Sequence, residues 1–189
     1  MVDEERLAAG SAGARPDGES VVRARADARD AGSRYACRVA WTGNLGTGTS
    51  AYDAYSRSHD IAVDGKPPVR GSADRAYRGD PGRHNPEDLL VAAVSACHML
   101  TYLALCARNG VAVLAYDDRA RGTLTTRRGR PAFEEIVLSP TVTLSDAAHE
   151  ALARRLHETA REKCIIANSC SMPIRHAVDI RIASGQQHD

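Results

Sequence analysis

The longest apolar stretch of the chain runs from Asn85 to Cys106 and predicts a central helix. Asn85 can cap the first free amides, Pro86 suits the first helical position, and the Asn109-Gly110 pair is typical of a helix end. Apolar or small side chains occupy every face of this helix. That pattern is typical of a helix surrounded by other elements rather than one lying on a surface.

Apolar positions alternate with a period of two on both sides of this helix and predict strands there. Before the helix, residues 34–41 and 50–63 predict a hairpin that leads into a third short strand, and residues 64–85 a long polar loop. After it, the alternation predicts a second hairpin and a last strand, at residues 111–126, 133–144 and 174–182.

A second helix is predicted from Asp146 to Lys163, with Ser145 as its cap and an apolar face that includes Leu156. The order of strands, long helix, strands, helix and strand favours the segregated α+β class. A sheet covers only one side of the central helix, yet that helix is apolar all round. The sequence therefore predicts an obligate homodimer in which two such helices lie between two sheets.

Composition predicts one folded domain, residues 34–189, preceded by a disordered or loosely structured extension, residues 1–33. The formal net charge is +1 and no basic tract is present, so a nucleic-acid partner is not predicted. The central helix is long enough to cross a bilayer, but it carries Ser95 and His98 and lacks a basic flank. We therefore expect a cytoplasmic protein that is not bound to a membrane.

The five cysteines are an odd number, which argues against a structural disulfide framework. The chain contains no CxxC or HExxH motif, and the adjacent side chains of Cys97 and His98 diverge around a helix, so no metal site is predicted. A reactive cysteine pair and simple packing both remain open. Among the other cysteines, Cys37 and Cys106 are interpreted as core residues.

Two strings of residues carry a resemblance to a known family. NPEDLLVAAVSACHMLTYL, at residues 85–103, and EKCIIANSCSMP, at residues 162–173, resemble the OsmC/Ohr family of thiol-dependent hydroperoxide reductases, in its OsmC-like branch. The resemblance covers about residues 35–183. It implies an intertwined α+β homodimer, with antiparallel sheets enclosing long central helices, that reduces organic hydroperoxides.

The resemblance also implies roles for individual residues. Cys97 matches the peroxidatic cysteine, Cys164 the resolving cysteine, and Glu87 the glutamate at the start of the helix. The family's arginine comes from the region ahead of the helix, where we favour Arg78 over Arg57. The loop at 43–49 holds no arginine, although the Ohr branch has one there.

Elementary chemistry favours an arginine in such a site. Peroxide reduction needs a thiolate, and a thiol with the usual pKa of about 8.5 is only a few per cent ionised near neutral pH. The helix dipole fades within the first turn, and Cys97 lies about three turns in, so a cation must supply the stabilisation. Ten residues of helix separate Glu87 from Cys97 by about 15 Å, which favours a site completed by the partner's glutamate.

The expected cycle is attack by Cys97 on the peroxide, release of an alcohol, and condensation of the sulfenic acid with Cys164. An external thiol, such as a dithiol, then reduces the disulfide, and no cofactor is expected. The apolar neighbours Met99, Leu100 and Leu103 suggest an organic hydroperoxide as substrate.

Alternatives remain open at this stage. Cys170 competes with Cys164 as the resolving cysteine, and His98 is either a hydrogen-bonded core residue or a group that tunes the thiol. The whole protein is alternatively a non-catalytic binder of apolar ligands, or a hydrolase or acyltransferase with Cys97 as nucleophile and a histidine as base.

Overall fold

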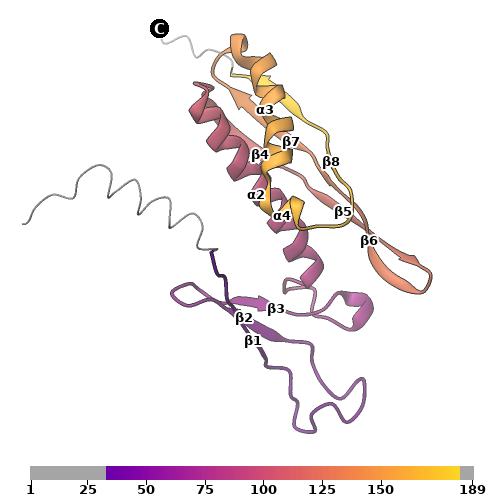
Figure 1. Cartoon of the computed structure of the whole chain (residues 1–189). Coiled ribbons are helices and arrows are strands. Elements are labelled where there is room, and N and C mark those ends of the chain that lie inside the picture. Colours follow the sequence, from indigo (N-terminus) through magenta and orange to yellow (C-terminus); the bar gives the residue numbers. More distant parts are fainter. Residues whose placement is uncertain (1–32, 184–189) are drawn as a thin grey trace, which may run out of the picture. The chain divides into compact units, whose positions relative to one another are not determined.

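The computed structural model describes residues 33–183, and Figure 1 shows the course of the chain. The chain divides into two compact units, Met1–Cys37 and Arg38–Asp189, and every described helix and strand lies in the second. The predicted extension at residues 1–33 falls outside the described residues except for Ser33, so it stays a prediction.

Ahead of the long helix lies a three-stranded antiparallel sheet in the order β1-β2-β3. Its strands are β1 (Arg38–Trp41), β2 (His59–Ala62) and β3 (Val69–Gly71). The predicted first hairpin is confirmed in its pairing, since Arg38 lies opposite Ala62 and Trp41 opposite His59. Residues 50–58 are not a strand, however, and the third strand lies within the segment predicted as a loop.

The central helix, α2 (Pro86–Arg108), begins where the sequence predicts. The Asn85 side chain accepts a hydrogen bond from the Asp88 backbone N–H at 2.7 Å, and the Asp88 carboxylate accepts one from the Asn85 N–H at 3.3 Å. This reciprocal capping box satisfies two amides that the helix itself leaves unpaired. The helix ends at Asn109, and Gly110 follows with φ 71°, a conformation that glycine adopts without strain.

Each of the two long stretches predicted as strands after α2 is broken once. The resulting strands are β4 (Val113–Asp118), β5 (Arg121–Arg127), β6 (Arg130–Leu138) and β7 (Pro140–Leu144). The predicted hairpin is confirmed for β5 and β6, whose turn residues Arg128 and Gly129 both have positive φ. Strand β4 pairs with β7 instead, so the two halves of the hairpin belong to different sheets.

The side chain of Asp118 links the two places where the predicted strands are broken. Its carboxylate accepts a hydrogen bond from the Ser139 backbone N–H at 2.7 Å and another from the Ser95 hydroxyl of α2 at 2.5 Å. Ser139 is the residue between β6 and β7, and Asp118 is the last residue of β4. One carboxylate therefore joins the break between β6 and β7 to the middle of the central helix.

The predicted second helix is confirmed, although its first turn differs. A short 3-10 turn (Ala147–His149) precedes α3 (Glu150–Lys163), and Asp146 rather than Ser145 provides the cap, accepting from the Ala148 N–H at 2.8 Å. Ser145 instead donates its backbone N–H to Ala112. A one-turn helix, α4 (Ile165–Asn168), follows.

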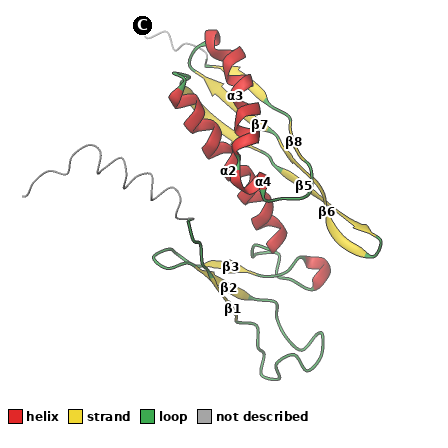
Figure 2. Cartoon of the chain, viewed as in Figure 1, coloured by secondary structure: helices red, strands yellow, loops and turns green. Residues whose placement is uncertain are grey.

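The C-terminal stretch is split rather than continuous. Strand β8 (Ile174–His176) runs parallel to β6, and β9 (Asp179–Ile182) runs parallel to β7. The sheets β4-β7-β9 and β5-β6-β8 are therefore mixed, and the expectation of purely antiparallel sheets is wrong for them. The α+β class itself is confirmed, as Figure 2 shows.

Two apolar clusters cover α2 unequally. One joins α2 to α3 and β7, and the other joins α2 to β6; their fully or nearly buried members include Tyr102, Leu105, Leu156, Leu144, Val94 and Ile136. Leu100 of α2 nevertheless remains 63% exposed in the single chain. By length and composition α2 is the one described helix that could span a membrane, a test that core helices of soluble proteins also pass.

The Asp118 bridge predicts a measurable loss of stability on substitution. Asp118→Ala leaves the Ser139 amide and the Ser95 hydroxyl without their acceptor, and we expect the free energy of unfolding to fall by about 2 kcal/mol. Urea unfolding followed by circular dichroism measures it. Asp117→Ala is the matched control because its side chain is 75% exposed and paired only with Arg119, so its effect should stay within about 0.5 kcal/mol. Equal effects at the two positions would contradict this account.

Candidate functional site

The structure brings the two predicted reactive cysteines together. Cys97 lies in the middle of α2 and is partly exposed, whereas Cys164 is the residue that ends α3 and is fully buried. The Cys97 thiol lies close enough to affect the pKa of the Cys164 thiol, and both cysteines are free. Residues 67 positions apart in sequence thus meet where the end of one helix crosses the middle of the other.

The two thiols sit in different environments. Burial raises the pKa of the Cys164 thiol to about 11, and the neighbouring Cys97 adds to this, while the backbone N–H groups of Ala167 and Ile166 oppose it. At neutral pH Cys164 is therefore protonated. Cys97 is the partly exposed member of the pair, so a small reactant can reach it.

Glu87 occupies the first turn of α2, and one of its carboxylate oxygens, Oε2, is buried without a hydrogen-bond partner among the described residues. A buried carboxylate oxygen in this condition lacks the donor that normally compensates its lost hydration. Glu87 also borders two cavities, one along α2 and one beside the β1–β2 region.

Of the two candidate arginines, Arg57 shares a cavity with Glu87. This cavity, of about 350 Å³, is mainly aromatic and apolar, and its lining includes Trp41, Tyr55, Tyr77, Arg57 and Glu87. The Arg57 guanidinium lies 4.3 Å from the Tyr52 ring centre and 4.2 Å from that of Tyr55, and donates to both backbone carbonyls at 2.7 Å.

Arg78 is placed differently. It is exposed, has φ 64°, and ends the short 3-10 turn at Arg75–Tyr77. It does not line either of the cavities that Glu87 borders. Arg57 therefore lines a cavity together with Glu87, and Arg78 does not.

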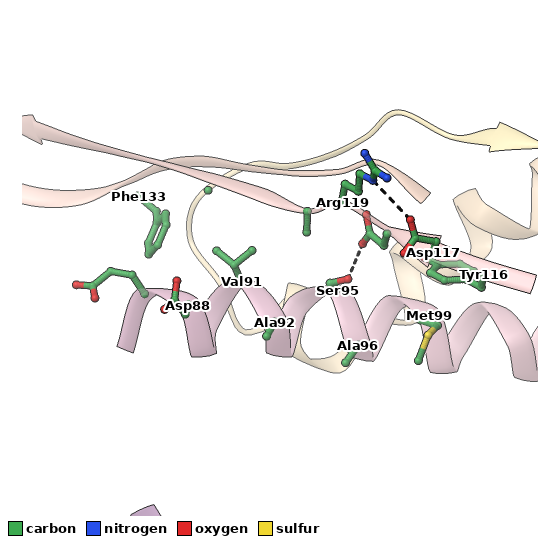
Figure 3. Close-up of a pocket in the computed structure, with 14 residues that line it drawn as sticks. Asp88, Val91, Ala92, Ser95, Ala96, Met99, Tyr116, Asp117, Arg119 and Phe133 are labelled. Atoms are coloured by element: carbon green, nitrogen blue, oxygen red, sulfur yellow. Dashed lines mark hydrogen bonds and ion pairs between the residues drawn. The ribbon is translucent and has the colours of Figure 1, made fainter. Parts of the chain in front are cut away.

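The larger cavity that Glu87 borders, of about 620 Å³, runs along α2. Figure 3 shows Val91 and Ser95 on the face of the helix that points toward the chain segment with Asp117 and Arg119, and Met99 also lines the cavity. Of the three apolar neighbours proposed as an access route, Met99 alone lines this cavity. Leu103 instead packs against the core near α3, and Leu100 is exposed.

A cluster of histidines lies beside the cysteine pair and was only partly predicted. His98 of α2 and His157 of α3 are 1% and 2% exposed, and the Nε2 of His98 is 3.1 Å from the Nδ1 of His157. His157 stacks on Tyr102 at 3.7 Å, and His176 of β8 lies 4.4 Å from the His98 ring. The interpretation of His98 as a hydrogen-bonded core residue is confirmed, but no local sequence signal identified His157 or His176.

Burial keeps these imidazoles neutral. Burial lowers the pKa of His98 to about 4 and, with the neighbouring His98, that of His157 to about 3; it also lowers the pKa of His176. Neutral rings add no positive charge beside Cys97, so they do not stabilise a thiolate there. Within residues 33–183 no group of three or more His, Cys, Asp or Glu side chains is arranged to hold a metal ion.

The remaining three cysteines differ in how far they are buried. Cys106 is buried in the cluster shared by α2 and α3, as predicted. Cys37 is exposed, so its interpretation as a core residue is wrong: it lies directly before β1, outside the described strands. Cys170 is partly buried and packs near Val94.

The comparisons with known proteins agree with this fold and these motifs. The model of the OsmC-like protein family matches residues 79–179, and the chain belongs to this family. The resemblance predicted from the sequence is therefore confirmed. A curated relative, the uncharacterized protein YmaD of Bacillus subtilis, is 27% identical over 88 residues, which are 45% of this chain and 59% of that protein. The chain thus spans less than two thirds of this relative's length.

Solved structures share the fold. An OsmC-like protein of unknown function from Vibrio cholerae is 29% identical, with a TM-score of 0.70 covering 77% of this chain and 99% of that one. An organic hydroperoxide resistance protein from Elizabethkingia anophelis is 16% identical, with a TM-score of 0.56 covering 80% and 99% of the two chains. At that lower identity the likeness shows the fold alone.

The neutral histidine pair predicts acid-sensitive stability. Its pKa values are lower in the folded than in the unfolded chain, so the unfolded state binds more protons as pH falls from about 6.5. The folded chain therefore keeps its full stability above pH 6.5 and loses it progressively as pH falls from about 6.5 to about 4 for His98 and about 3 for His157. In the double variant His98→Leu/His157→Leu, the loss of unfolding free energy between pH 7 and pH 4 should shrink by about 2 kcal/mol or more.

Urea unfolding at both pH values measures this effect. His84→Leu, at an exposed histidine, is the control and should leave the pH dependence of the wild type unchanged. If the double variant loses as much stability on acidification as the wild type, other groups govern the acid response.

Proposed function

We propose that the protein is a thiol-dependent peroxidase that reduces organic hydroperoxides to alcohols. The observation that carries this proposal is the closeness of the free thiols of Cys97 and Cys164 in a chain of the OsmC-like family. Structural neighbours described as organic hydroperoxide resistance proteins support the same chemistry. An apolar-ligand binder has no need for paired free thiols, so it is the weaker candidate.

The proposed reaction has three balanced steps. The Cys97 thiolate attacks one peroxide oxygen, the O–O bond breaks, and the alkoxide leaves and takes up a proton, which leaves a sulfenic acid on Cys97. The Cys164 thiol attacks that sulfur, water leaves, and a disulfide forms. An external dithiol then reduces the disulfide through a mixed disulfide and returns both thiols. No cofactor takes part.

The environments of the two cysteines support this division of roles. Cys164 is fully buried and has a pKa of about 11, so it is a poor first nucleophile at neutral pH. Cys97 is partly exposed and reaches the reactant first. Once Cys97 is oxidised, the adjacent Cys164 attacks within the same fold, which compensates for its low thiolate fraction.

An arginine and Glu87 complete the proposed site. The surroundings of Arg57 support it over Arg78, because Arg57 borders the same aromatic cavity as Glu87 and the buried Glu87 Oε2 lacks a donor. A guanidinium can donate to a carboxylate and a thiolate at once. We propose that Glu87 orients Arg57 and that Arg57 stabilises the attacking thiolate.

We further propose that this pair acts on the cysteines of a second copy in a homodimer. About 15 Å of helix separates Glu87 from Cys97, so one straight helix cannot join them. Large apolar side chains also remain exposed in the single chain, including Leu100 at 63%, Leu114 at 62% and Val39 at 61%. A second copy would cover such surfaces. Free cysteines throughout the described chain fit the proposed cytoplasmic location.

The cysteine roles predict distinct products with an organic hydroperoxide. One equivalent of cumene hydroperoxide should remove two thiols from the reduced wild type and give a Cys97–Cys164 disulfide in mass spectrometry. Cys164→Ser should stop at a sulfenic acid on Cys97 that a dimedone probe traps, and Cys97→Ser should react no faster than free cysteine.

Cys170→Ser is the matched control for the resolving role and should retain the wild-type linkage. A Cys97–Cys170 product in the wild type would reassign the resolving cysteine. If the wild type loses no thiols at a rate above that of free cysteine, the peroxidase proposal fails. An acylated Cys97 after incubation with an activated ester would then favour the hydrolase alternative.

The arginine assignment predicts unequal effects of two substitutions. Arg57→Met removes the guanidinium but keeps a long apolar stem, and we expect the rate of Cys97 oxidation to fall at least tenfold. Arg78→Met is the control and should stay within about twofold of the wild type. Stopped-flow measurement of thiol loss gives both rates. The reverse order would assign the role to Arg78.

Mixed dimers test whether the site is shared between copies. If Arg57 acts on the partner's cysteines, a refolded equal mixture of Arg57→Met and Cys97→Ser chains has one intact site in each mixed dimer. Half of the dimers are mixed, so about a quarter of wild-type activity returns. A mixture that stays inactive, although sedimentation detects dimers, would place the arginine and the cysteine of each site on the same chain.

A further inference from the structure

The buried contact between His98 and His157 takes no part in the chemistry proposed above. The two imidazoles join α2 to α3 across 59 residues of sequence, with 3.1 Å between Nε2 of His98 and Nδ1 of His157. Both rings are at least 98% buried. Because a hydrogen bond between two neutral imidazoles needs one donor and one acceptor, the pair holds complementary tautomers.

Burying this histidine pair costs stability compared with apolar side chains of the same size. The other nitrogen of each ring, Nδ1 of His98 and Nε2 of His157, is buried without a hydrogen-bond partner in the described part of the chain. One of these two nitrogens must carry a proton and the other a lone pair, whichever tautomers are present. Unpaired buried polar atoms cost stability, and apolar side chains of similar volume would pack here as well or better. The pair must therefore provide something other than stability.

A hydrogen bond of this kind can specify how α2 is rotated about its own axis. Apolar or small side chains lie on every face of α2, so hydrophobic packing alone favours many rotations of the helix about its axis. A shift of one residue turns a helix by about 100° and would carry Cys97 away from Cys164. A hydrogen bond with defined direction permits one rotation, as buried polar residues do when they fix helix register.

The imidazole pair and the thiol pair bridge the same two segments. On α2, Cys97 and His98 are consecutive residues, so the position of one ring fixes that of the neighbouring thiol. On the other side, His157 lies within α3 and Cys164 ends it, about two helical turns later and on the same face. Holding His98 against His157 therefore holds Cys97 toward Cys164.

We propose that His98 and His157 are positioning residues whose hydrogen bond sets the rotation of α2 at which the thiols of Cys97 and Cys164 meet. The inference rests on the proposed function, because it gives the thiol contact a catalytic purpose. It does not depend on peroxide for its test. Neither histidine touches the substrate or serves as an acid or base.

The test measures how readily the disulfide forms in a glutathione redox buffer. In this exchange the thiols of Cys97 and Cys164 and one oxidised glutathione give the protein disulfide and two reduced glutathiones, so the equilibrium constant reports how well the fold holds the sulfurs together. Peptide mapping of the Cys97–Cys164 linkage follows the reaction. His98→Leu and His157→Leu should each lower the constant at least tenfold, which raises the reduction potential by about 30 mV.

Conservative variants separate positioning from general packing. The terminal amide of Gln reaches where Nε2 of His98 lies, and that of Asn reaches where Nδ1 of His157 lies. His98→Gln and His157→Asn should therefore keep the wild-type constant, whereas His98→Asn, which is too short, should lower it. Because one contact is lost in each case, the double leucine variant should match either single variant.

His176→Leu is the matched control, since His176 packs on the His98 ring without joining the His98–His157 hydrogen bond. It should change the constant by less than twofold. Urea unfolding at pH 7 should show the leucine variants as stable as the wild type or more stable. If they do not fold, the comparison of His98→Gln with His98→Asn carries the same test.

The possible results are distinguishable. Folded leucine variants with the wild-type constant would overturn the positioning role, and so would a wild type that forms no Cys97–Cys164 disulfide in the buffer. A wild type that forms the disulfide, depends on the histidines, and fails to react with cumene hydroperoxide would reject the peroxidase proposal alone.

Discussion

The covering of α2 is the constraint on which the rest of the structure depends. This helix of 23 residues is apolar or small on nearly every face, and a helix of that kind is stable in water only when other elements surround it. Strands β6 and β7 and helix α3 cover part of it. Leu100 is exposed, so the single chain does not cover the surface of α2 around it. Positions buried within one chain form the core, and the positions left open are those that the proposed homodimer would cover.

Burial alone does not orient such a helix, and a few directional contacts do. The capping box at Asn85 fixes where α2 begins, and the hydrogen bond from the Ser95 hydroxyl to Asp118 fixes one face of the helix against the end of β4. On another face, His98 meets His157 of α3. Each contact is polar within or beside an apolar cluster, where a wrong rotation would leave it unpaired. The chain thereby gains a unique arrangement that hydrophobic packing would not specify.

The parts of this fold that could be predicted from the sequence are those with local signals. Both long helices were predicted because their apolar patterns are local, and for α2 the capping residue Asn85 directly precedes the helix. The strand breaks at residues 119–120 and 139 were missed because the alternation continues across them, and the hydrogen bond at residue 139 joins it to the distant Asp118. The parallel pairing of β8 and β9 is likewise non-local.

The residues of the candidate site also differ in whether a sequence signal identified them. Cys97 and Cys164 were paired through a family resemblance between two motifs, since neither periodicity nor spacing places the end of α3 beside the middle of α2. His157 could not be found in this way, because nothing near it in sequence marks it as the partner of His98. The preference for Arg78 over Arg57 came from position in the chain. In the structure, the rings of Tyr52 and Tyr55 contact the guanidinium of Arg57. The order of residues in the sequence does not reveal this contact.

The burial that orders the helices also explains why the proposed chemistry needs a distant cation. A protonated histidine next to Cys97 would be the simplest stabiliser of a thiolate, yet burial lowers the pKa of His98 to about 4 and keeps it neutral at physiological pH. The same burial raises the pKa of Cys164 and makes it unsuitable for the first attack. A permanently charged group must therefore come from outside the α2–α3 contact. Arginine meets that requirement because no degree of burial in a protein neutralises it. In the proposed mechanism, activation therefore depends on a residue ahead of α2, and the length of the helix assigns that residue to the second copy in the proposed homodimer.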